Sequence, residues 1–217
     1  MRRLILSLLA SVALAGTLWL ALTSFAPGSA IATWAPCPRN WGWAPAWRPR
    51  TSPLEAVRFE VADGHGKLCY GRPSLRDRTM IGGAAVPYGQ IWRTGANEPT
   101  TLHLDTAVRI GGLVLSPGSY SLYTVPAPEK WEIVINHSIH QWGLESEYDD
   151  EVRSHEIARW TLAVATLAAP VEKLTFRAFP NSTGAVDLVF SWQTSEFRLT
   201  LEPLNPELST APAADAP

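Results

Sequence analysis

The feature that most constrains the fold is an alternation of apolar and polar residues that begins at Leu54 and recurs almost to the C-terminus. Val57, Phe59 and Val61, for example, alternate with charged residues. Successive side chains of a β-strand point to opposite faces, so this period is typical of strands with one buried face. Further apolar sets of this kind are Leu102/Leu104, Trp131/Ile133/Ile135, Trp160/Leu162/Val164, Leu174/Phe176/Ala178, Val186/Leu188/Phe190/Trp192 and Phe197/Leu199/Leu201.

Glycine and proline mark the turns between these strands. Gly111-Gly112 predicts a tight hairpin, because a type I′ turn needs positive φ at both central residues. No long stretch of 3.6-residue periodicity separates the strands, which argues against βαβ units. The sequence therefore predicts an all-β domain over residues 54–205, an antiparallel β-sandwich (jelly-roll-like) of about 8–10 strands.

The N-terminus has the layout of an export segment. Two arginines precede an uncharged apolar run over residues 4–26, which predicts an N-terminal hydrophobic helix. Its length suits a membrane anchor, whereas Ala30-Ile31-Ala32 offers a small-x-small cleavage site for a signal peptide. Both alternatives remain for residues 1–26. In either case we expect an extracytoplasmic location, on the periplasmic or cell-surface side, with the membrane as a partner through this segment.

A linker and a tail flank the expected domain. Residues 27–53 contain six prolines and four tryptophans, which predicts an extended linker. Its tryptophans suit the headgroup layer of a membrane, and packing on the domain is the alternative. Residues 206–217 are rich in alanine and proline, and we expect a disordered tail.

Charge and cysteine content exclude some functions. Residues 54–217 carry thirteen basic and twenty acidic residues, a net charge of −7, which argues against nucleic acid as a partner. Cys37 and Cys69 are the two cysteines, and in an exported chain they can pair as a disulfide that staples the linker to the domain. The alternative is a free buried thiol at Cys69. Neither has the neighbours of a metal site, and we expect no metal and no cofactor.

Residues 71–100 break the strand pattern and are the expected place of function. Long irregular segments in a compact domain usually bind a ligand or cover the core. We expect a ligand site for a small molecule or an envelope protein at Trp92, Arg93, Asn97 and Glu98, together with Gln141 and Trp142. The structural alternative is that Arg93 pairs with Glu98 while Asn97 holds a turn.

The chain also resembles a known family. The blocks GRPSLRDR, VPYGQIWRTGANEPTTL, LSPGSYSLYTVP, WEIVIN, QWG and APVEKLTF are similar to the domain of unknown function 2911 family. The resemblance covers most of residues 57–179 and onward. It implies an exported bacterial β-sandwich protein and no established activity.

Three functions therefore compete. The first is a binding or scaffolding module of the bacterial cell envelope, at the outer face of the cytoplasmic membrane. The second is an envelope hydrolase with Glu98 or His103 as acid/base, although no nucleophile-elbow motif accompanies the serines. The third is a purely structural domain. The sequence leaves open whether the chain is an enzyme.

Overall fold

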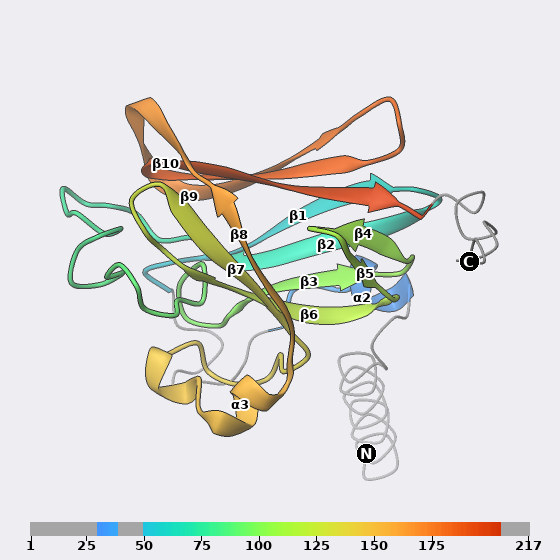
Figure 1. Ribbon diagram of the computed structural model, residues 1–217, viewed down its shortest axis with the longest axis horizontal. Coiled ribbons are helices and arrows are strands. Elements are labelled where there is room, and N and C mark those ends of the chain that lie inside the picture. The colour runs from blue at the N-terminus through green and yellow to red at the C-terminus, as the bar shows by residue number, and fades with distance from the viewer. Residues whose placement is uncertain (1–29, 39–49, 205–217) are drawn as a thin grey trace, which may run out of the picture.

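The alternating segments form strands of two antiparallel sheets, described by the computed structural model for residues 30–38 and 50–204 (Figure 1). The larger sheet has the order β1 (Leu54–Val61), β2 (Gly64–Gly71), β3 (Thr100–Leu104), β6 (Gly118–Val125), β7 (Lys130–Asn136) and β8 (Glu156–Ala163). The smaller sheet has the order β5 (Leu113–Leu115), β4 (Val108–Ile110), β10 (Val186–Pro203) and β9 (Ala165–Pro180). The prediction of an antiparallel all-β fold is confirmed.

The strand order differs from the expected jelly-roll-like arrangement. Most consecutive strands of the larger sheet are hydrogen-bonded neighbours, which makes this sheet a meander. After β3 the chain leaves the larger sheet, forms the hairpin of β4 and β5, and then returns as β6 to pair with β3. In the hairpin, β4 pairs with β10 of the smaller sheet. Short turns explain the pairing of β1 with β2 and of β6 with β7, because a hairpin-length turn favours pairing with the next antiparallel strand. The pairs β2–β3 and β7–β8 form across longer connections, residues 72–99 and 137–155.

The turn between β4 and β5 has the predicted chemistry. Gly111 and Gly112 have φ values of 55° and 84°, and Ile110 pairs directly with Leu113. Two successive positive φ values give the hairpin the right-handed twist of its strands. The predicted tight hairpin is therefore confirmed.

The predicted apolar faces meet in one core between the sheets. Trp131 on β7 and Trp192 on β10 are both fully buried. Phe190 and Phe197 of β10 stack with ring centroids 4.6 Å apart. The alternation of large apolar side chains thus brings the two sheets face to face, because each sheet can bury its apolar face only against the other.

The irregular segment over residues 71–100 closes one end of this core (Figure 1). Its first part bridges to β9 through Ser74 and Lys173. The side chain of Gln193 on β10 then accepts hydrogen bonds from the backbone N–H groups of Met80 and Ile81 at 2.9 and 3.2 Å. The segment finally returns to β6 through a backbone bridge between Trp92 and Thr124. It therefore joins the two sheets at their open end.

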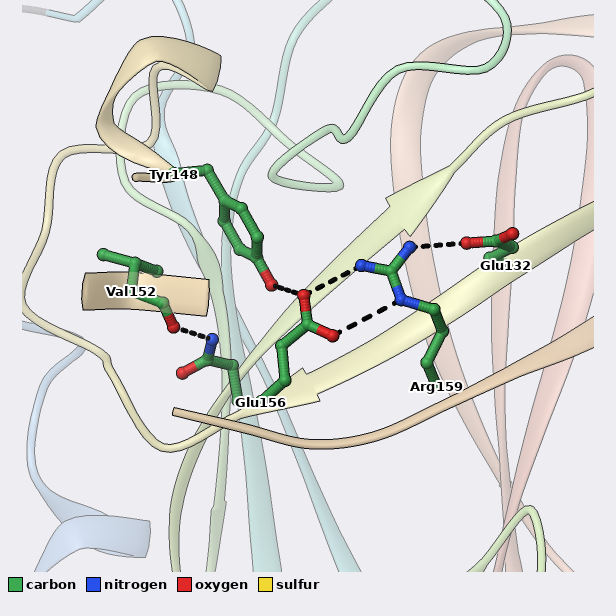
Figure 2. A network of polar contacts seen from close by, with 6 residues as sticks. Glu132, Tyr148, Val152, Glu156 and Arg159 are labelled. Atoms are coloured by element: carbon green, nitrogen blue, oxygen red, sulfur yellow. Dashed lines mark hydrogen bonds and ion pairs between the residues drawn. The ribbon is translucent and has the colours of Figure 1, made fainter. Parts of the chain in front are cut away.

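The acidic connection after β7 contains η1 (Glu145–Glu147) and α3 (Asp150–Ser154). Figure 2 shows how its end is fastened: the Tyr148 hydroxyl donates to Glu156 Oε1 at 2.6 Å, and Arg159 bridges Glu156 and Glu132. Burial, together with the hydrogen bond to Glu156, raises the pKa of Tyr148 above its ordinary value. Tyr148 and Val152 cover the outer face of the larger sheet as a second, small apolar cluster.

The expected linker contains a helix. Its described part includes α2 (Ala30–Trp34), which lies in the proline-free stretch before Pro36 and packs on β2 and β3. The expected N-terminal hydrophobic helix over residues 1–26 and the tail over residues 206–217 lie outside the described residues. Among the helices that the structure describes, none is long and apolar enough to cross a membrane.

Candidate functional site

The predicted cluster begins with Trp92, which lies in the core. Its side chain is only 3% exposed. The indole stacks on Trp192 with ring centroids 5.8 Å apart and meets the edge of Trp131 at 6.2 Å. Its backbone exchanges two hydrogen bonds with Thr124. Trp92 thus anchors the irregular segment and does not offer a ring face to a ligand.

The expected pair between Arg93 and Glu98 is not formed. Arg93 Nη1 instead donates to the Gly143 carbonyl at 2.7 Å and lies 3.5 Å from Glu145 Oε1. Glu98, which is buried, accepts a hydrogen bond of 2.6 Å from Arg50. Burial lowers the pKa of the Arg93 guanidinium, whereas the charge of Glu145 acts in the opposite direction. Sequence reasoning paired the nearest opposite charges, but the partners come from segments distant in sequence.

Asn97 and the segment around residue 142 do lie together. Asn97 has the left-handed φ of 68°, and its amide donates to the Ser52 carbonyl at 3.2 Å. The Gly143 N–H donates to the Asn97 carbonyl at 3.1 Å. A Cβ atom on Gly143 would lie 2.4 Å from both Asn97 O and the Arg93 side chain. The two predicted segments therefore meet through tight backbone contact.

Gln141 and Trp142 complete the predicted set. The Gln141 amide donates to the Tyr123 hydroxyl at 2.8 Å and to the Ser138 carbonyl at 3.0 Å. Burial raises the pKa of Tyr123 to about 12, so this hydroxyl stays protonated. Trp142, the residue after Gln141, is partly buried. A ligand role for these six residues stays a prediction, because the described contacts give most of their polar groups a structural partner.

A hollow of about 410 Å³ opens elsewhere, between α2 and the start of β2. Its volume falls in the range of ligand pockets, roughly 300–1,000 Å³. The lining residues are Trp34, Asp63, Gly64, His65, Asp105 and Thr106. A smaller hollow of about 170 Å³ shares Trp34 and His65 with it. Neither of these hollows is lined by a residue of the predicted cluster.

His65 and Asp105 form the polar centre of the larger hollow. Asp105 accepts from the His65 backbone N–H at 2.5 Å, and its other oxygen lies 3.2 Å from His65 Nδ1. Thr33 of α2 also donates to this carboxylate at 3.4 Å. Gly64 permits the approach, since a Cβ atom there would lie 2.5 Å from Asp105 Oδ1. The end of β3 and the start of β2 thus hold one carboxylate in a fixed position.

The wall of the hollow is aromatic and acidic. The Trp34 side chain is 62% exposed, and its ring centroid lies 5.1 Å from that of His65. Asp63 is exposed and accepts a hydrogen bond from Thr106 at 3.2 Å. The lining contains two carboxylates and no lysine or arginine. Asp105 has His65 as its ion-pair partner, and Arg58 lines the smaller hollow that shares Trp34 and His65. An indole beside carboxylates that no lysine or arginine of the same lining neutralises is a surface that attracts cations.

His103 of β3 lies two residues before Asp105 in sequence. Its side chain is on the outer face of the larger sheet, on which α2 packs. Its neighbours across the strands are Lys67 on β2 and Ser119 on β6. Ser119 Oγ lies 2.7 Å from His103 Nδ1, and Thr101 Oγ1 lies 3.3 Å from its Nε2. Burial and the nearby Lys67 charge lower the pKa of His103 to about 3. Asp105, which follows the last residue of β3, pairs with His65 and not with His103.

Cys37 and Cys69 are joined by a disulfide, which fastens the segment after α2 to β2. In residues 30–38 and 50–204, no three His, Cys, Asp or Glu side chains group as metal ligands.

These features define an antiparallel two-sheet β-domain with a small acidic hollow beside a disulfide-fastened N-terminal segment. Residues 52–201 match the family described as protein of unknown function (DUF2911), and the chain belongs to this family. No curated protein matches the chain, and no solved structure matches it.

Sequence reasoning missed the hollow because its residues come from three separate segments. Trp34 is one of four tryptophans in a linker that is rich in proline and tryptophan. His65 and Asp105 lie at strand ends that are 40 residues apart in sequence. One signal was present. Asp63-Gly64-His65 places two polar side chains around a glycine at the hairpin between two predicted strands, where binding residues often lie.

Proposed function

We propose that this chain is an exported binding module of the bacterial cell envelope, which takes a small organic cation in the hollow at Trp34, Asp63, His65 and Asp105. The observation that carries the proposal is the pairing of an exposed indole with two carboxylates in a lining without lysine or arginine. An ammonium or guanidinium group gains from both partners, because the indole face attracts a cation and the carboxylates supply charge-assisted hydrogen bonds.

Export is supported by the basic, then apolar N-terminus and by the disulfide. Disulfides persist mainly in oxidising compartments outside the cytoplasm. The apolar run over residues 4–26 precedes α2 by only a few residues, so an anchored chain holds the hollow close to the membrane surface. The membrane is therefore the proposed partner of the N-terminal segment.

Calorimetric titration of the full chain in detergent with choline and with agmatine tests the ligand class, and glucose serves as the neutral probe. We expect heat of binding with both cations and none with glucose. Trp34→Ala and Asp63→Asn should each weaken binding, by roughly tenfold if one partner of a cation is lost. The matched control is Asp77→Asn, because Asp77 is also exposed but lies in the irregular segment away from the hollow. Equal heats for wild type and Trp34→Ala would exclude the hollow, and binding of glucose alone would exclude the cation.

A further inference from the structure

We propose that Ser119 and His103 are a latent nucleophile–base pair, which residues 30–38 cover and which reduction of the Cys37–Cys69 disulfide uncovers. Neither Ser119 nor His103 lines the cation hollow, although Trp34 of the cover and Asp105 do. The pair lies on the outer face of the larger sheet, where β2, β3 and β6 align Lys67, His103 and Ser119 in one row.

The geometry is that of a serine activated by an imidazole. Ser119 Oγ and His103 Nδ1 are 2.7 Å apart, which is hydrogen-bond distance. In the tautomer with a proton on Nε2, this nitrogen donates to Thr101 Oγ1 and leaves Nδ1 to accept the Ser119 proton. The hydroxyl of Thr101 therefore fixes the ring in the orientation that a base requires.

The pair is buried in a face of the larger sheet on which α2 packs against β2 and β3. His103 is 4% exposed and Ser119 is 7% exposed. Residues 30–38 are held over this face by hydrogen bonds from Lys67 Nζ to the Ala35 carbonyl at 2.8 Å and from Thr33 to Asp105 at 3.4 Å. Hydrogen bonds of this kind contribute only about 1 kcal/mol each. The disulfide is the one covalent cross-link among these fastenings of the described segment. Without it, these hydrogen bonds and the packing of Thr33 and Trp34 are the described contacts that hold the cover.

The cover also keeps the base weak. Burial is the largest cause of the lowered pKa of His103, and the neighbouring ammonium of Lys67 is the second. Burial lowers the pKa of Lys67 itself to about 8. When residues 30–38 leave, both side chains meet water, and the Lys67 ammonium turns away from the Ala35 carbonyl that held it. The pKa of His103 then rises toward its ordinary value near 6.5, which suits a general base at neutral pH.

Opening consumes a dithiol. Its thiolate attacks the sulfur of Cys37, because Cys37 is partly exposed whereas Cys69 is 2% exposed. The resulting mixed disulfide is resolved by the second thiol of the reagent. The protein gains two thiols, and the dithiol becomes a disulfide.

The exposed pair then takes an acyl ester. Ser119 Oγ forms a bond to the carbonyl carbon while its proton passes to His103 Nδ1. The C–O bond to the alcohol breaks, and the alcohol leaves with that proton. Water hydrolyses the acyl-serine by the same route. A fluorophosphonate reports the first half of this chemistry, since Ser119 Oγ displaces fluoride from phosphorus and stays labelled.

Fluorophosphonate labelling of the full chain in detergent, with and without dithiothreitol, tests the proposal. In the wild type we expect labelling at Ser119, located by peptide mass spectrometry, only after reduction. In the double variant Cys37→Ser/Cys69→Ser we expect the same labelling without dithiothreitol. His103→Gln should slow labelling of the reduced chain by about 10²-fold or more, the usual contribution of a positioned base. Ser121→Ala is the matched control, because Ser121 is buried on the same strand face but donates to the Ser138 carbonyl. It should label like the wild type.

Near-ultraviolet circular dichroism of the buried tryptophans shows whether the domain stays folded. The proposal is overturned if the domain stays folded but Ser119 is labelled neither in the reduced wild type nor in the double variant. It is also overturned if His103→Gln does not slow the labelling. Loss of the tryptophan signal on reduction and in the double variant also overturns it, because the disulfide then holds the whole domain and not the cover alone. Cation titration of the oxidised chain is unaffected by either result, so the two proposals fail separately.

Discussion

Single residues on the outer face of the larger sheet contribute to stability in a way that depends on pH. His103 is buried and neutral, with its pKa lowered to about 3 from an ordinary value of 6.5. The unfolded chain therefore binds more protons than the folded chain between these two values. The free energy of unfolding falls as pH falls through this window, and it gains nothing from His103 above pH 6.5.

His103→Gln should remove this part of the acid sensitivity. Glutamine keeps a donor and an acceptor for Thr101 and Ser119 but does not titrate. From pH 6.5 to pH 3 the wild type should lose on the order of 3 kcal/mol more than the variant. Urea unfolding at a series of pH values measures the difference, with His137→Gln as the control because His137 is exposed. Parallel curves for wild type and His103→Gln would contradict the assignment.

Trp92 is a residue of the irregular segment that packs against both sheets. It touches Trp131 of the larger sheet and Trp192 and Phe190 of the smaller one. The irregular segment over residues 71–100 thus contributes a residue to the core between the sheets. The indole fills a place that neither sheet fills from its own strands.

Trp92→Ala should lower the free energy of unfolding by about 3–5 kcal/mol, the usual cost of truncating a buried tryptophan. Guanidinium unfolding should show a lower midpoint with an unchanged slope. Tyr88→Ala is the control from the same segment, since Tyr88 is 47% exposed and should change stability little. A ligand role for Trp92 without a core role would leave the midpoint unchanged.

At the scale of elements, the irregular segment over residues 71–100 depends on a strand for its backbone partners. Gln193 of β10 satisfies the N–H groups of Met80 and Ile81, and its own amide donates to the Ile81 carbonyl at 3.3 Å. Gln193 has a φ of 53° at an irregularity in the pairing of β9 with β10. The irregularity is therefore part of what turns this side chain toward the segment.

Gln193→Ala should loosen the segment without opening the sheets. The substitution leaves up to three backbone groups without a partner, at a cost of roughly 1–3 kcal/mol. Hydrogen exchange at Met80 and Ile81 should accelerate, while exchange in β6 and β7 stays slow. Gln90→Ala is the control because Gln90 is exposed. Uniform acceleration across the domain would instead show that segment and sheets open together.

At the scale of the whole molecule, the alternation was enough to predict the strands, their buried faces and the hairpin at Gly111-Gly112. These properties depend on local periodicity and turn chemistry, which neighbouring residues determine. The observed strand order, which differs from the expected jelly-roll-like one, was not predictable in the same way, because strand order depends on which connections cross between sheets. The helix α2 was missed since proline density was averaged over the linker, although Pro36 follows the helix.

The candidate sites show the same division. The sequence grouped Arg93 and Asn97 with Gln141 and Trp142, and the structure brings the two segments together at the adjacent Gly143. It did not show that Glu98 pairs with Arg50, or that His65 pairs with Asp105. Those partners are set by tertiary packing across sequence separations of 48 and 40 residues. Periodicity carries no information over such distances.

The disulfide also decides how the domain responds to mechanical tension. Cys37 and Cys69 are 32 residues apart in sequence, so a pull on the N-terminal side reaches β2 directly through the sulfur atoms. The chain between them carries no load while the bond is intact. Reduction adds the stretch from Cys37 to Leu54, where β1 enters the sheet, to the path between the N-terminus and the sheet; this stretch is about 60 Å long when fully extended. In a chain pulled from its N-terminal end, force would therefore act first on β2, the second strand of the larger sheet, while the disulfide is intact. After reduction it would act first on the edge strand β1, once the added stretch is extended.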